Sequence, residues 1–497
     1  MDKKHVLVIG SGFAGLSAAT HLAAEGCLVT LLEKNSSPGG RARKFEHQGF
    51  VFDMGPSWYW MPDVFEDYFA RFDKKVSDYY DLLRLDPSYA VIYGEKEHWD
   101  IPADLDDFKA MLEKEEPGAG VQLDQFLAQA KYKYEVGIHD LVTRPSRSLL
   151  EFASPSLLRD VLKMDVFQSM SKHVRKFFKS EKIIRLMEFP VLFLGETAEN
   201  IPALYSLMNY ADIALGTWYP QKGMHEIVRG MVELAEEKGV TIRYQAEVEE
   251  IEITNGLATG VRLISGEKIE ADVIVAGADY HHVDKHLVNP KYSNYSEDYW
   301  DKRVLAPSSL LFYVGVDKKL QNLRHHNLFF DEDLGPHADA IYRNPRWPEK
   351  PLFYACVPSQ TDSSVAPEGM ENLFLLVPLA PDLKDTEELR EKYYNLIMDR
   401  LEKYSGQEIR SHVIFKRSYA HKDFKKDYHA YKGNAYGLAN TLTQTAILKP
   451  SLKNKKVSNL YYTGQLTVPG PGVPPSLISG QVVAKEVMKE HKFSQKM

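Results

Sequence analysis

Three glycines close to the N-terminus constrain the fold of this chain more than any other feature. Gly10, Gly12 and Gly15 follow an apolar run at residues 5–9 and precede an alanine-rich run at residues 16–25. This order predicts a strand, a tight turn and a helix. The first glycine permits the turn, the second lets the backbone approach a pyrophosphate, and the third allows close packing of the helix on the strand. The sequence therefore predicts a βαβ unit that binds a dinucleotide.

An acidic residue ends the second predicted strand of this unit. Glu33 closes the apolar run at residues 29–33, and a carboxylate at this place can accept hydrogen bonds from ribose hydroxyl groups. The same charge repels a 2′-phosphate, which disfavours NADP. Phe13 and Ala14 lie in the glycine turn just before the predicted helix, whose unpaired N–H groups and dipole favour phosphate. We therefore expect these residues to contact the cofactor.

Composition excludes several classes of protein. The chain has 497 residues and a formal net charge of −8, which argues against a nucleic-acid-binding protein with a basic face. Its two cysteines, Cys27 and Cys356, stand far apart in apolar stretches, which predicts a reducing compartment and no metal centre. The sequence holds no run of about 18 apolar residues that would predict a transmembrane helix. We expect a cytoplasmic protein, or one bound only to the surface of a membrane.

Elements of α/β type recur later in the chain. A predicted helix at residues 224–238 precedes four predicted strands, of which the last two are expected to form a hairpin: 241–244, 247–253, 257–263 and 268–275. The C-terminal part predicts a strand at 460–463, a glycine- and proline-rich loop and a helix at 476–489. Between these parts the pattern predicts strands and one long helix, at 309–316, 373–379 and 386–404.

A second glycine motif follows Glu33 and identifies the dinucleotide. The run from Glu33 and Lys34 to Gly39-Gly40-Arg41-Ala42 resembles the extended FAD signature of the amine oxidase and carotenoid desaturase superfamily. A second glycine turn at Gly40 brings backbone N–H groups near the pyrophosphate, and Arg41 supplies a forked cation. The resemblance implies that FAD is the cofactor.

Further segments resemble parts of the same superfamily. Gly55, Pro56 and Ser57 match the loop that approaches the flavin ring, and Val248 falls where a strand passes along the adenine. The resemblance places the C-terminal loop and the start of the last helix along the ribitol chain and the isoalloxazine, which implies cofactor contacts from Gly464, Gln465, Gly472, Val473 and Pro474.

The chain is most similar to the bacterial and fungal type of carotenoid desaturase. This resemblance spans nearly the whole chain through residues 49–56, 219–224, 358–369, 428–437 and 443–444. It implies FAD-dependent desaturation of phytoene by hydride transfer to the flavin, in carotenoid biosynthesis. Val468 departs from the family, which usually has Thr-His-Pro-Gly where this chain has residues 467–470, and Gln465 replaces a frequent acid. Because valine cannot transfer a proton, position 468 holds no acid–base group.

The fold class that these patterns imply is mixed α/β, a Rossmann-like flavoprotein of the two-dinucleotide-binding-domain type with an inserted substrate domain. The predicted FAD domain is discontinuous and comprises residues 1–75, 222–285 and 441–497. The predicted substrate domain comprises residues 76–135 and 286–440. Residues 136–221 are expected to form a helical region that is able to associate with a membrane.

Several activities are compatible with the same scaffold. A C30 diapophytoene desaturase, a carotenoid isomerase that uses reduced FAD, and a terminal oxidase remain alternatives to a phytoene desaturase. An amine oxidase fits less well, because the desaturase-like segments are more specific than the FAD motifs. A non-catalytic FAD or lipid carrier is also less favoured, because the FAD motifs are intact. The electron acceptor implied is oxygen or a quinone.

A polyene substrate would have to come from a membrane. At about 0.8 kcal/mol per buried CH₂, a C40 hydrocarbon is almost absent from water, so the resemblance implies peripheral attachment to the inner face of the membrane. Residues 157–178 combine apolar and basic side chains and could lie among headgroups, although core packing explains the same pattern. Trp58, Tyr59 and Trp60 could line a substrate tunnel or pack in the core.

The sequence names no catalytic base. Asp53 is the acid nearest the flavin loop, and Arg144 and Arg147 are candidates for orienting a substrate or stabilising the loop. Each of the three is also compatible with a structural role.

Overall fold

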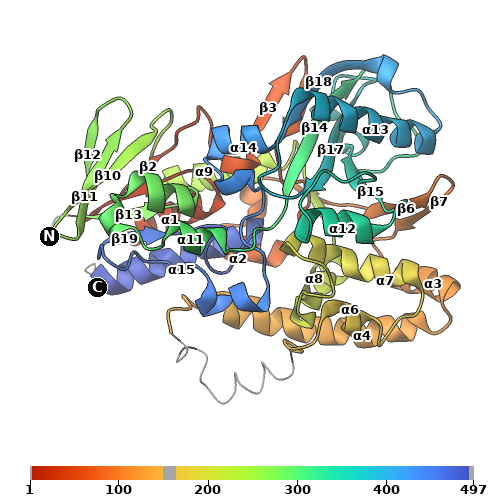
Figure 1. Ribbon diagram of the computed structural model, residues 1–497, viewed down its shortest axis with the longest axis horizontal. Helices are drawn as coiled ribbons and strands as arrows, with labels where there is room; N and C mark the ends of the chain where they lie inside the picture. The colour runs from red at the N-terminus through yellow and green to blue at the C-terminus, as the bar shows by residue number, and fades with distance from the viewer. Residues whose placement is uncertain (1–2, 149–150, 152–163, 492–497) are drawn as a thin grey trace.

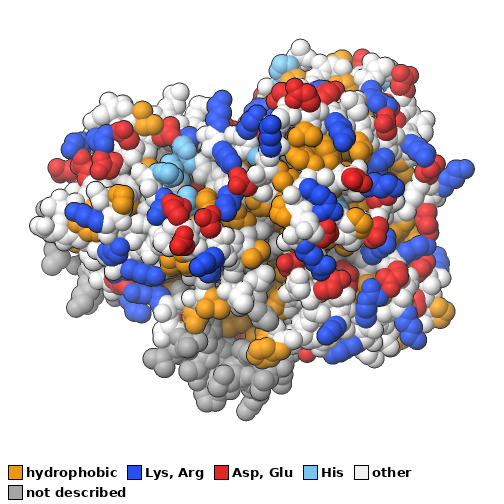
Figure 2. Space-filling view, viewed as in Figure 1, with side chains coloured by type: hydrophobic (Ala, Val, Ile, Leu, Met, Phe, Trp, Pro, Cys, Tyr) orange, Lys and Arg blue, Asp and Glu red, His pale blue; other side chains and the backbone are white. Residues whose placement is uncertain are grey.

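Two large sheets, three smaller sheets and a group of helices make up the described part of the structure. The computed structural model describes residues 3–148, 151 and 164–491. In Figure 1 a parallel sheet with its helices occupies the left side, and a mixed sheet occupies the upper right. The helical region lies below the mixed sheet. On the face shown in Figure 2, acidic and basic side chains are interspersed across all three parts.

The parallel sheet has five strands in the order β19-β13-β1-β2-β9. The strands are β1 (His5–Ile9), β2 (Leu28–Leu32), β9 (Thr241–Arg243), β13 (Val273–Ala276) and β19 (Leu460–Tyr462). They come from all three chain segments assigned to the FAD domain. Every residue of β13 and β19 is buried, as expected for parallel strands that are covered on both faces.

Three helices accompany this sheet, and two of them touch at a glycine. Helix α1 (Phe13–Ala24) packs against α9 (His225–Glu237) and α15 (Val473–His491). A Cβ atom on Gly480 of α15 would lie 2.3 Å from the carbonyl oxygen of Ala14 and 2.7 Å from the nitrogen of Ala18. Glycine at this position therefore allows the two helices to approach closely, a contact that the sequence analysis did not anticipate.

The predicted hairpin at residues 257–275 is partly wrong. Strands β10 (Val248–Thr254), β11 (Leu257–Leu263) and β12 (Lys268–Glu270) form a separate antiparallel sheet. The predicted strand at 268–275 divides after β12, because its second half is β13 of the parallel sheet. The division follows burial: β12 remains at least partly exposed, whereas β13 is entirely buried.

The mixed sheet has seven strands in the order β18-β14-β17-β16-β15-β6-β7. The strands are β6 (Tyr89–Gly94), β7 (Glu97–Ile101), β14 (Ser308–Val316), β15 (His326–Phe329), β16 (Phe353–Cys356), β17 (Glu371–Leu379) and β18 (Val413–Tyr419). Side chains alternate along β14, so that Phe312 packs beside α13 (Glu387–Ser405) while Leu311 and Tyr313 face the rest of the molecule. The predicted strands at 309–316 and 373–379 and the helix at 386–404 are confirmed within two residues.

The helical region includes two helices that precede residue 136. Its helices are α3 (Leu105–Glu115), α4 (Ala119–Tyr134), α6 (Met170–Val174), α7 (Glu181–Glu188) and α8 (Leu207–Asn209). Helices α3 and α4 belong to residues 76–135, which were assigned to the substrate domain, but α4 packs against α8. The remaining helices and strands are β3 (Lys44–His47), β4 (Phe50–Asp53), α2 (Pro62–Ala70), β5 (Leu82–Arg84), β8 (Trp218–Pro220), α10 (Tyr280–His282), α11 (Glu297–Asp301), α12 (Leu334–Tyr342) and α14 (His421–Tyr428).

The basic, apolar segment at residues 157–178 lies partly outside the described residues, because 152–163 are not described. In the described part, Met170 and Val174 are fully buried in α6, whereas Phe167 is 83% exposed. Arg175 forms an ion pair with Glu181 at 2.6 Å. The described apolar positions of α6 therefore pack in the core. No described helix is long and apolar enough to cross a membrane.

Candidate cofactor and substrate cavity

A cavity of about 550 Å³ connects the parallel sheet with the mixed sheet. One end is bordered by the loops that follow β1, β2, β13 and β19. The other end is bordered by side chains from the mixed sheet, α12 and the helical region. Residues 54–58 and 60 lie on the wall as well, from the loop after β4. The cavity therefore has two ends: a polar, glycine-rich end beside the parallel sheet and a second end beside the mixed sheet and the helical region.

The residues predicted to bind FAD gather at the first end. All but one of them line the cavity: Gly10, Gly12, Phe13, Ala14, Glu33, Lys34, Gly40, Arg41, Gly55, Pro56, Ser57, Val248, Gly464, Gln465, Gly472, Val473 and Pro474. The exception is Gly15, on which a Cβ atom would lie 1.9 Å from the carbonyl oxygen of Gly10. Gly15 therefore serves the close packing of helix and strand that its position in the motif predicts.

Gly12 leaves room for a cofactor in front of helix α1. A Cβ atom at this position would meet no described atom within 4 Å. Gly12 is the N-cap of α1 and no side chain caps its first turn, so the amides there face the cavity. A helix N-terminus open to a cavity favours an anion such as a pyrophosphate.

Helix α15 presents a different N-terminus to the same cavity. It begins at Val473, and Pro474 and Pro475 occupy its first turn. Proline has no N–H group, so the first turn of α15 offers fewer backbone hydrogen-bond donors than that of α1. The positive end of the helix dipole remains.

Glu33 is held rigidly at the cavity wall. One carboxylate oxygen accepts hydrogen bonds from the backbone N–H (3.0 Å) and hydroxyl (2.6 Å) of Ser11, and the other accepts from the backbone and side-chain N–H groups of Asn35 at 2.8 and 2.9 Å. The side chain is only 4% exposed. These four donors meet the roughly four lone-pair sites of the carboxylate, so a ribose hydroxyl would bind Glu33 by replacing the Ser11 hydroxyl or the Asn35 side-chain amide.

Arg41 is a half-buried cation with an unused donor. Its guanidinium donates one hydrogen bond to the carbonyl of Asn434 at 3.3 Å and stacks over the ring of Tyr428 at 5.2 Å. Its Nε atom is buried and has no hydrogen-bond partner in the described part of the chain. Burial lowers the pKa of Arg41, an effect that Asp279 partly offsets. These features fit a site for an anionic group, as the FAD pyrophosphate requires.

Sequence reasoning missed part of this wall. Asp279 and His282 line the cavity after β13, and His429 and Asn440 line it from later segments. The available signal was Gly277, which directly follows the buried strand β13. A Cβ atom on Gly277 would lie 3.2 Å from the Cα atom of Gly15, so a second close backbone approach occurs there.

The second end of the cavity is apolar. It is lined mainly by aliphatic and aromatic side chains, including Phe189, Leu192, Leu207, Met208, Leu311, Leu328, Phe330, Leu334, Ala338, Ile341, Leu352, Phe374 and Leu376. His337 also lies here, with Nδ1 accepting from the backbone of Leu352 and Nε2 donating to the carbonyl of Pro378, both at 2.9 Å. Burial lowers the pKa of His337 to about 4, so its ring is neutral. The described residues of this end contribute no charged side chain.

The three consecutive aromatic residues divide between cavity and core. Trp58 and Trp60 line the cavity. Tyr59 is 1% exposed, stacks on Phe65 at 4.4 Å and shares a hydrogen bond with Tyr80 at 3.0 Å. Trp58 and Trp60 therefore border the cavity, whereas Tyr59 packs in the core.

The structure places none of the three catalytic candidates on the described wall of this cavity. Asp53 accepts hydrogen bonds from the backbone N–H groups of Met224 (2.7 Å) and His225 (2.9 Å), at the start of α9. Burial raises its pKa to about 6. Arg147 pairs with Glu486 and Glu490 of α15, and Arg144 donates to the carbonyls of Asp140 and Glu151. All three serve the packing of the chain.

Replacing Asp53 with asparagine tests its role as a helix cap. The amide keeps one acceptor oxygen but leaves the second backbone N–H unpaired, so we expect the free energy of unfolding to fall by about 1 kcal/mol. Chemical denaturation measures this change, and the flavin absorbance of the purified variant is expected to match the wild type. Loss of FAD with unchanged stability would contradict this assignment.

Comparisons with known proteins agree with the fold and the cavity. The family model described as flavin containing amine oxidoreductase matches residues 13–488. The chain is 41% identical to a carotenoid 3,4-desaturase from Haloarcula japonica over 99% of each chain. It is 32% identical to a zeta-carotene-forming phytoene desaturase from Myxococcus xanthus, over 98% of this chain and 94% of the relative.

Solved structures share the fold at lower identity. An oxidoreductase from Methanosarcina mazei superposes with a TM-score of 0.65 at 17% identity, covering 97% of this chain and 100% of that one. Putrescine oxidase bound to putrescine gives a TM-score of 0.60 at 13% identity, with 98% and 100% coverage. The family model matches residues 13–488, a range that includes nearly all of the residues that border the cavity. The chain belongs to the flavin containing amine oxidoreductase family and is an FAD-dependent oxidoreductase.

Proposed function

We propose that the protein desaturates a carotenoid with FAD as the hydride acceptor. The observation that carries this proposal is the continuity of the cavity, which leads from the glycine-rich end to an apolar end. A substrate that reaches both ends has its reacting carbon atoms next to the cofactor and its remaining length among apolar side chains. Carotenoids have this form, because they are long and carry few or no polar groups.

The residues of the first end would hold FAD in one orientation. Glu33 would accept the ribose hydroxyls, and Gly12 and Arg41 would face the pyrophosphate. The backbone at Val248 would pass along the adenine. The flavin ring would lie by the loop ending at Ser57 and by the C-terminal loop from residue 464 onward. When bound, FAD supplies a site that accepts hydride from carbon.

The residues of the apolar end would exclude water and hold the polyene. Each buried CH₂ contributes about 0.8 kcal/mol, so a long hydrocarbon can be bound without a polar contact. Burial raises the pKa values of Tyr342 and Tyr354 on this wall, so both remain protonated at neutral pH. The described part of this end offers no carboxylate to take up the proton that leaves with the hydride.

Two carotenoid substrates are candidates. The 41% identity to a carotenoid 3,4-desaturase favours desaturation of the 3,4-bond, since the identity to a phytoene desaturase is 32%. Phytoene, which the family resemblance of the motifs implies, is the second candidate. For either substrate the protein would collect a hydrophobic molecule at the inner surface of a membrane, and oxygen or a quinone would reoxidise the flavin.

Product analysis distinguishes these activities. Purified FAD-loaded protein is incubated with liposomes that contain phytoene or an already conjugated C40 carotenoid, and the extracted products are analysed by mass spectrometry. Desaturation removes two hydrogen atoms per step, isomerisation leaves the mass unchanged, and oxygenation adds oxygen. Products that retain all hydrogen atoms with both substrates would contradict the proposal.

Replacing Ala338 with phenylalanine tests where the substrate binds. Ala338 lies on α12 and borders the apolar end, far in the sequence from every predicted FAD contact. A larger side chain would narrow this end, so we expect carotenoid turnover to fall by about tenfold or more, which corresponds to about 1.4 kcal/mol. Flavin absorbance is expected to stay unchanged, and Ala338→Val is expected to show an intermediate effect. Wild-type turnover by the phenylalanine variant would contradict this placement.

A further inference from the structure

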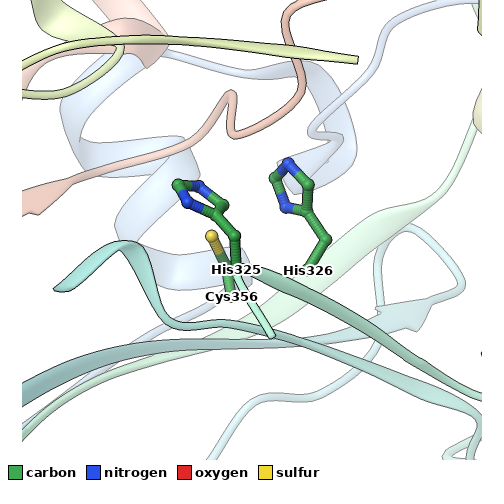
Figure 3. Close-up of side chains that lie close together, drawn as sticks. All are labelled: His325, His326 and Cys356. Atoms are coloured by element: carbon green, nitrogen blue, oxygen red, sulfur yellow. The ribbon is translucent and has the colours of Figure 1, made fainter. Parts of the chain in front are cut away.

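Two histidines and a cysteine meet on one face of the mixed sheet, and none of the three is among the residues predicted to bind FAD. Strand β15 pairs with β16 in a register that sets His326 opposite Cys356, and His325 immediately precedes β15. One ligand atom from each of the three side chains lies within 4.8 Å of the other two. Figure 3 shows the three side chains on the same side of the strands, with the His325 ring beside the sulfur of Cys356. All three residues are at most 4% exposed.

The hydrogen bonds of the two histidines leave one nitrogen of each ring unused. Nδ1 of His325 bonds to the hydroxyl of Thr361 at 2.9 Å, and Nδ1 of His326 bonds to the hydroxyl of Tyr354 at 2.6 Å. The Nε2 atoms of both rings are buried and have no partner in the described part of the chain. Histidines that bind metals typically use one nitrogen for the ion and the other for an oxygen atom nearby. Both rings therefore have the arrangement of a metal ligand.

A small cavity provides space for a fourth ligand. It measures about 20 Å³ and is bordered by His325, Cys356, Asp53 and Tyr219, among others. A volume of about 10–15 Å³ is sufficient for one water molecule. Zinc sites with three protein ligands commonly hold a water molecule in the fourth position. The cavity therefore has room for one water molecule beside His325 and Cys356.

Ligand type and charge select the ion. Thiolate and imidazole ligands suit zinc and cuprous copper, whereas magnesium and calcium require oxygen ligands. The thiolate of Cys356 and the carboxylate of Asp53, which borders the same small cavity, together carry two negative charges. A divalent zinc ion neutralises both, whereas a cuprous ion leaves one negative charge in a buried site.

We propose that His325 Nε2, His326 Nε2 and Cys356 Sγ bind one zinc ion, with water as the fourth ligand. Ligand atoms in a tetrahedral zinc site lie about 3.3–3.8 Å apart, given bonds of about 2.0–2.3 Å. One ligand atom from each side chain lies within 4.8 Å of the others, so side-chain rotations would bring the three to this spacing. Binding displaces the proton of the Cys356 thiol to solvent, and the Zn–S bond replaces the S–H bond.

The zinc site would fix a loop on the cavity wall. The hydroxyl of Tyr354 donates to the hydroxyl of Ser57 at 3.0 Å, so it accepts the hydrogen bond from Nδ1 of His326. Trp58 stacks on the ring of His326 at a centroid distance of 4.1 Å. An ion that immobilises His326 would thereby hold both residues in place, next to the cofactor end. The role is structural and does not depend on the identity of the substrate.

Metal analysis of the full-length, FAD-loaded protein tests the site. The protein is purified, incubated with zinc chloride, dialysed and analysed by inductively coupled plasma mass spectrometry. We expect one zinc ion per chain in the wild type and in Cys27→Ser, which changes the other buried cysteine, and loss of zinc in Cys356→Ser. Sub-stoichiometric zinc in the wild type, zinc retained in Cys356→Ser, or copper bound in preference to zinc would each overturn the proposal.

A second measurement needs no variant. Cobalt(II) in a tetrahedral thiolate site gives intense visible bands and a thiolate-to-cobalt charge-transfer band, which can be separated from the flavin by difference spectroscopy against the zinc-loaded protein. We expect both features after cobalt is added to metal-free wild-type protein, and their loss when zinc is added. Weak bands typical of octahedral cobalt would overturn the proposal. Either result leaves the assignment of carotenoid desaturation untouched, because no turnover is measured.

Discussion

Replacing Gly12 with valine is expected to weaken FAD binding by about 100-fold or more, equivalent to about 2.8 kcal/mol. The physical reason is that a side chain at this position points into the space in front of helix α1, where a Cβ atom meets no described atom within 4 Å. The backbone of Gly12 has φ −70° and ψ 175°, which valine adopts without strain. The stability of the FAD-free protein is therefore expected to change by less than about 0.5 kcal/mol. Flavin titration and chemical denaturation measure the two effects.

Gly15→Ala is the matched control for this prediction. Its Cβ atom would lie 1.9 Å from the carbonyl oxygen of Gly10, so α1 and β1 would have to separate. We expect the FAD-free protein to lose about 1–3 kcal/mol of stability. The two glycines of one motif thus act on different quantities, cofactor affinity and folding. If Gly12→Val bound FAD normally, or if Gly15→Ala left the FAD-free protein as stable as the wild type, the interpretation of the motif would be wrong.

Arg41→Ala is expected to give the second large effect. Removing one member of a buried, hydrogen-bonded charge pair costs about 2–5 kcal/mol, so FAD affinity is expected to fall by about 30-fold to several thousand-fold. The FAD-free protein is expected to be as stable as the wild type or more so, because it no longer buries a cation whose Nε atom has no partner. Flavin titration and denaturation of the FAD-free variant test the two parts.

Arg41→Lys separates charge from geometry. Lysine keeps the positive charge but lacks the planar fork that can make two parallel hydrogen bonds to a phosphate. We expect its affinity for FAD to lie between those of the wild type and the alanine variant. Equal affinities for wild type and Arg41→Ala would show that the pyrophosphate lies elsewhere.

The sequence predicted the first βαβ unit closely because its signals are local. The expected elements at residues 5–9, 16–25 and 29–33 correspond to β1, α1 and β2, and the helix begins only three residues earlier than expected. The wall of the cofactor end was also predictable, since glycine turns and Glu33 mark places where a backbone or a carboxylate must face a ligand.

What the sequence did not predict depends on contacts between distant segments. Asp53 caps a helix that begins at residue 225, and nothing near Asp53 in the chain indicates that helix. Cys356 meets His326 only through the register of β15 and β16. The apolar wall is assembled from many segments whose hydrophobic residues match those of any core, so their exposure to a cavity is a property of the fold alone.

The central claim is that a carotenoid in this cavity transfers hydride to FAD. Anaerobic incubation of FAD-loaded protein with liposomes containing phytoene, or an already conjugated C40 carotenoid, measures this step directly through the absorbance of the oxidised flavin. We predict that one carotenoid bleaches the flavin, in proportion to a product that lacks two hydrogen atoms, while Ala338→Phe bleaches more slowly. A flavin that remains oxidised with both carotenoids, in protein that retains its full complement of FAD, would contradict the account.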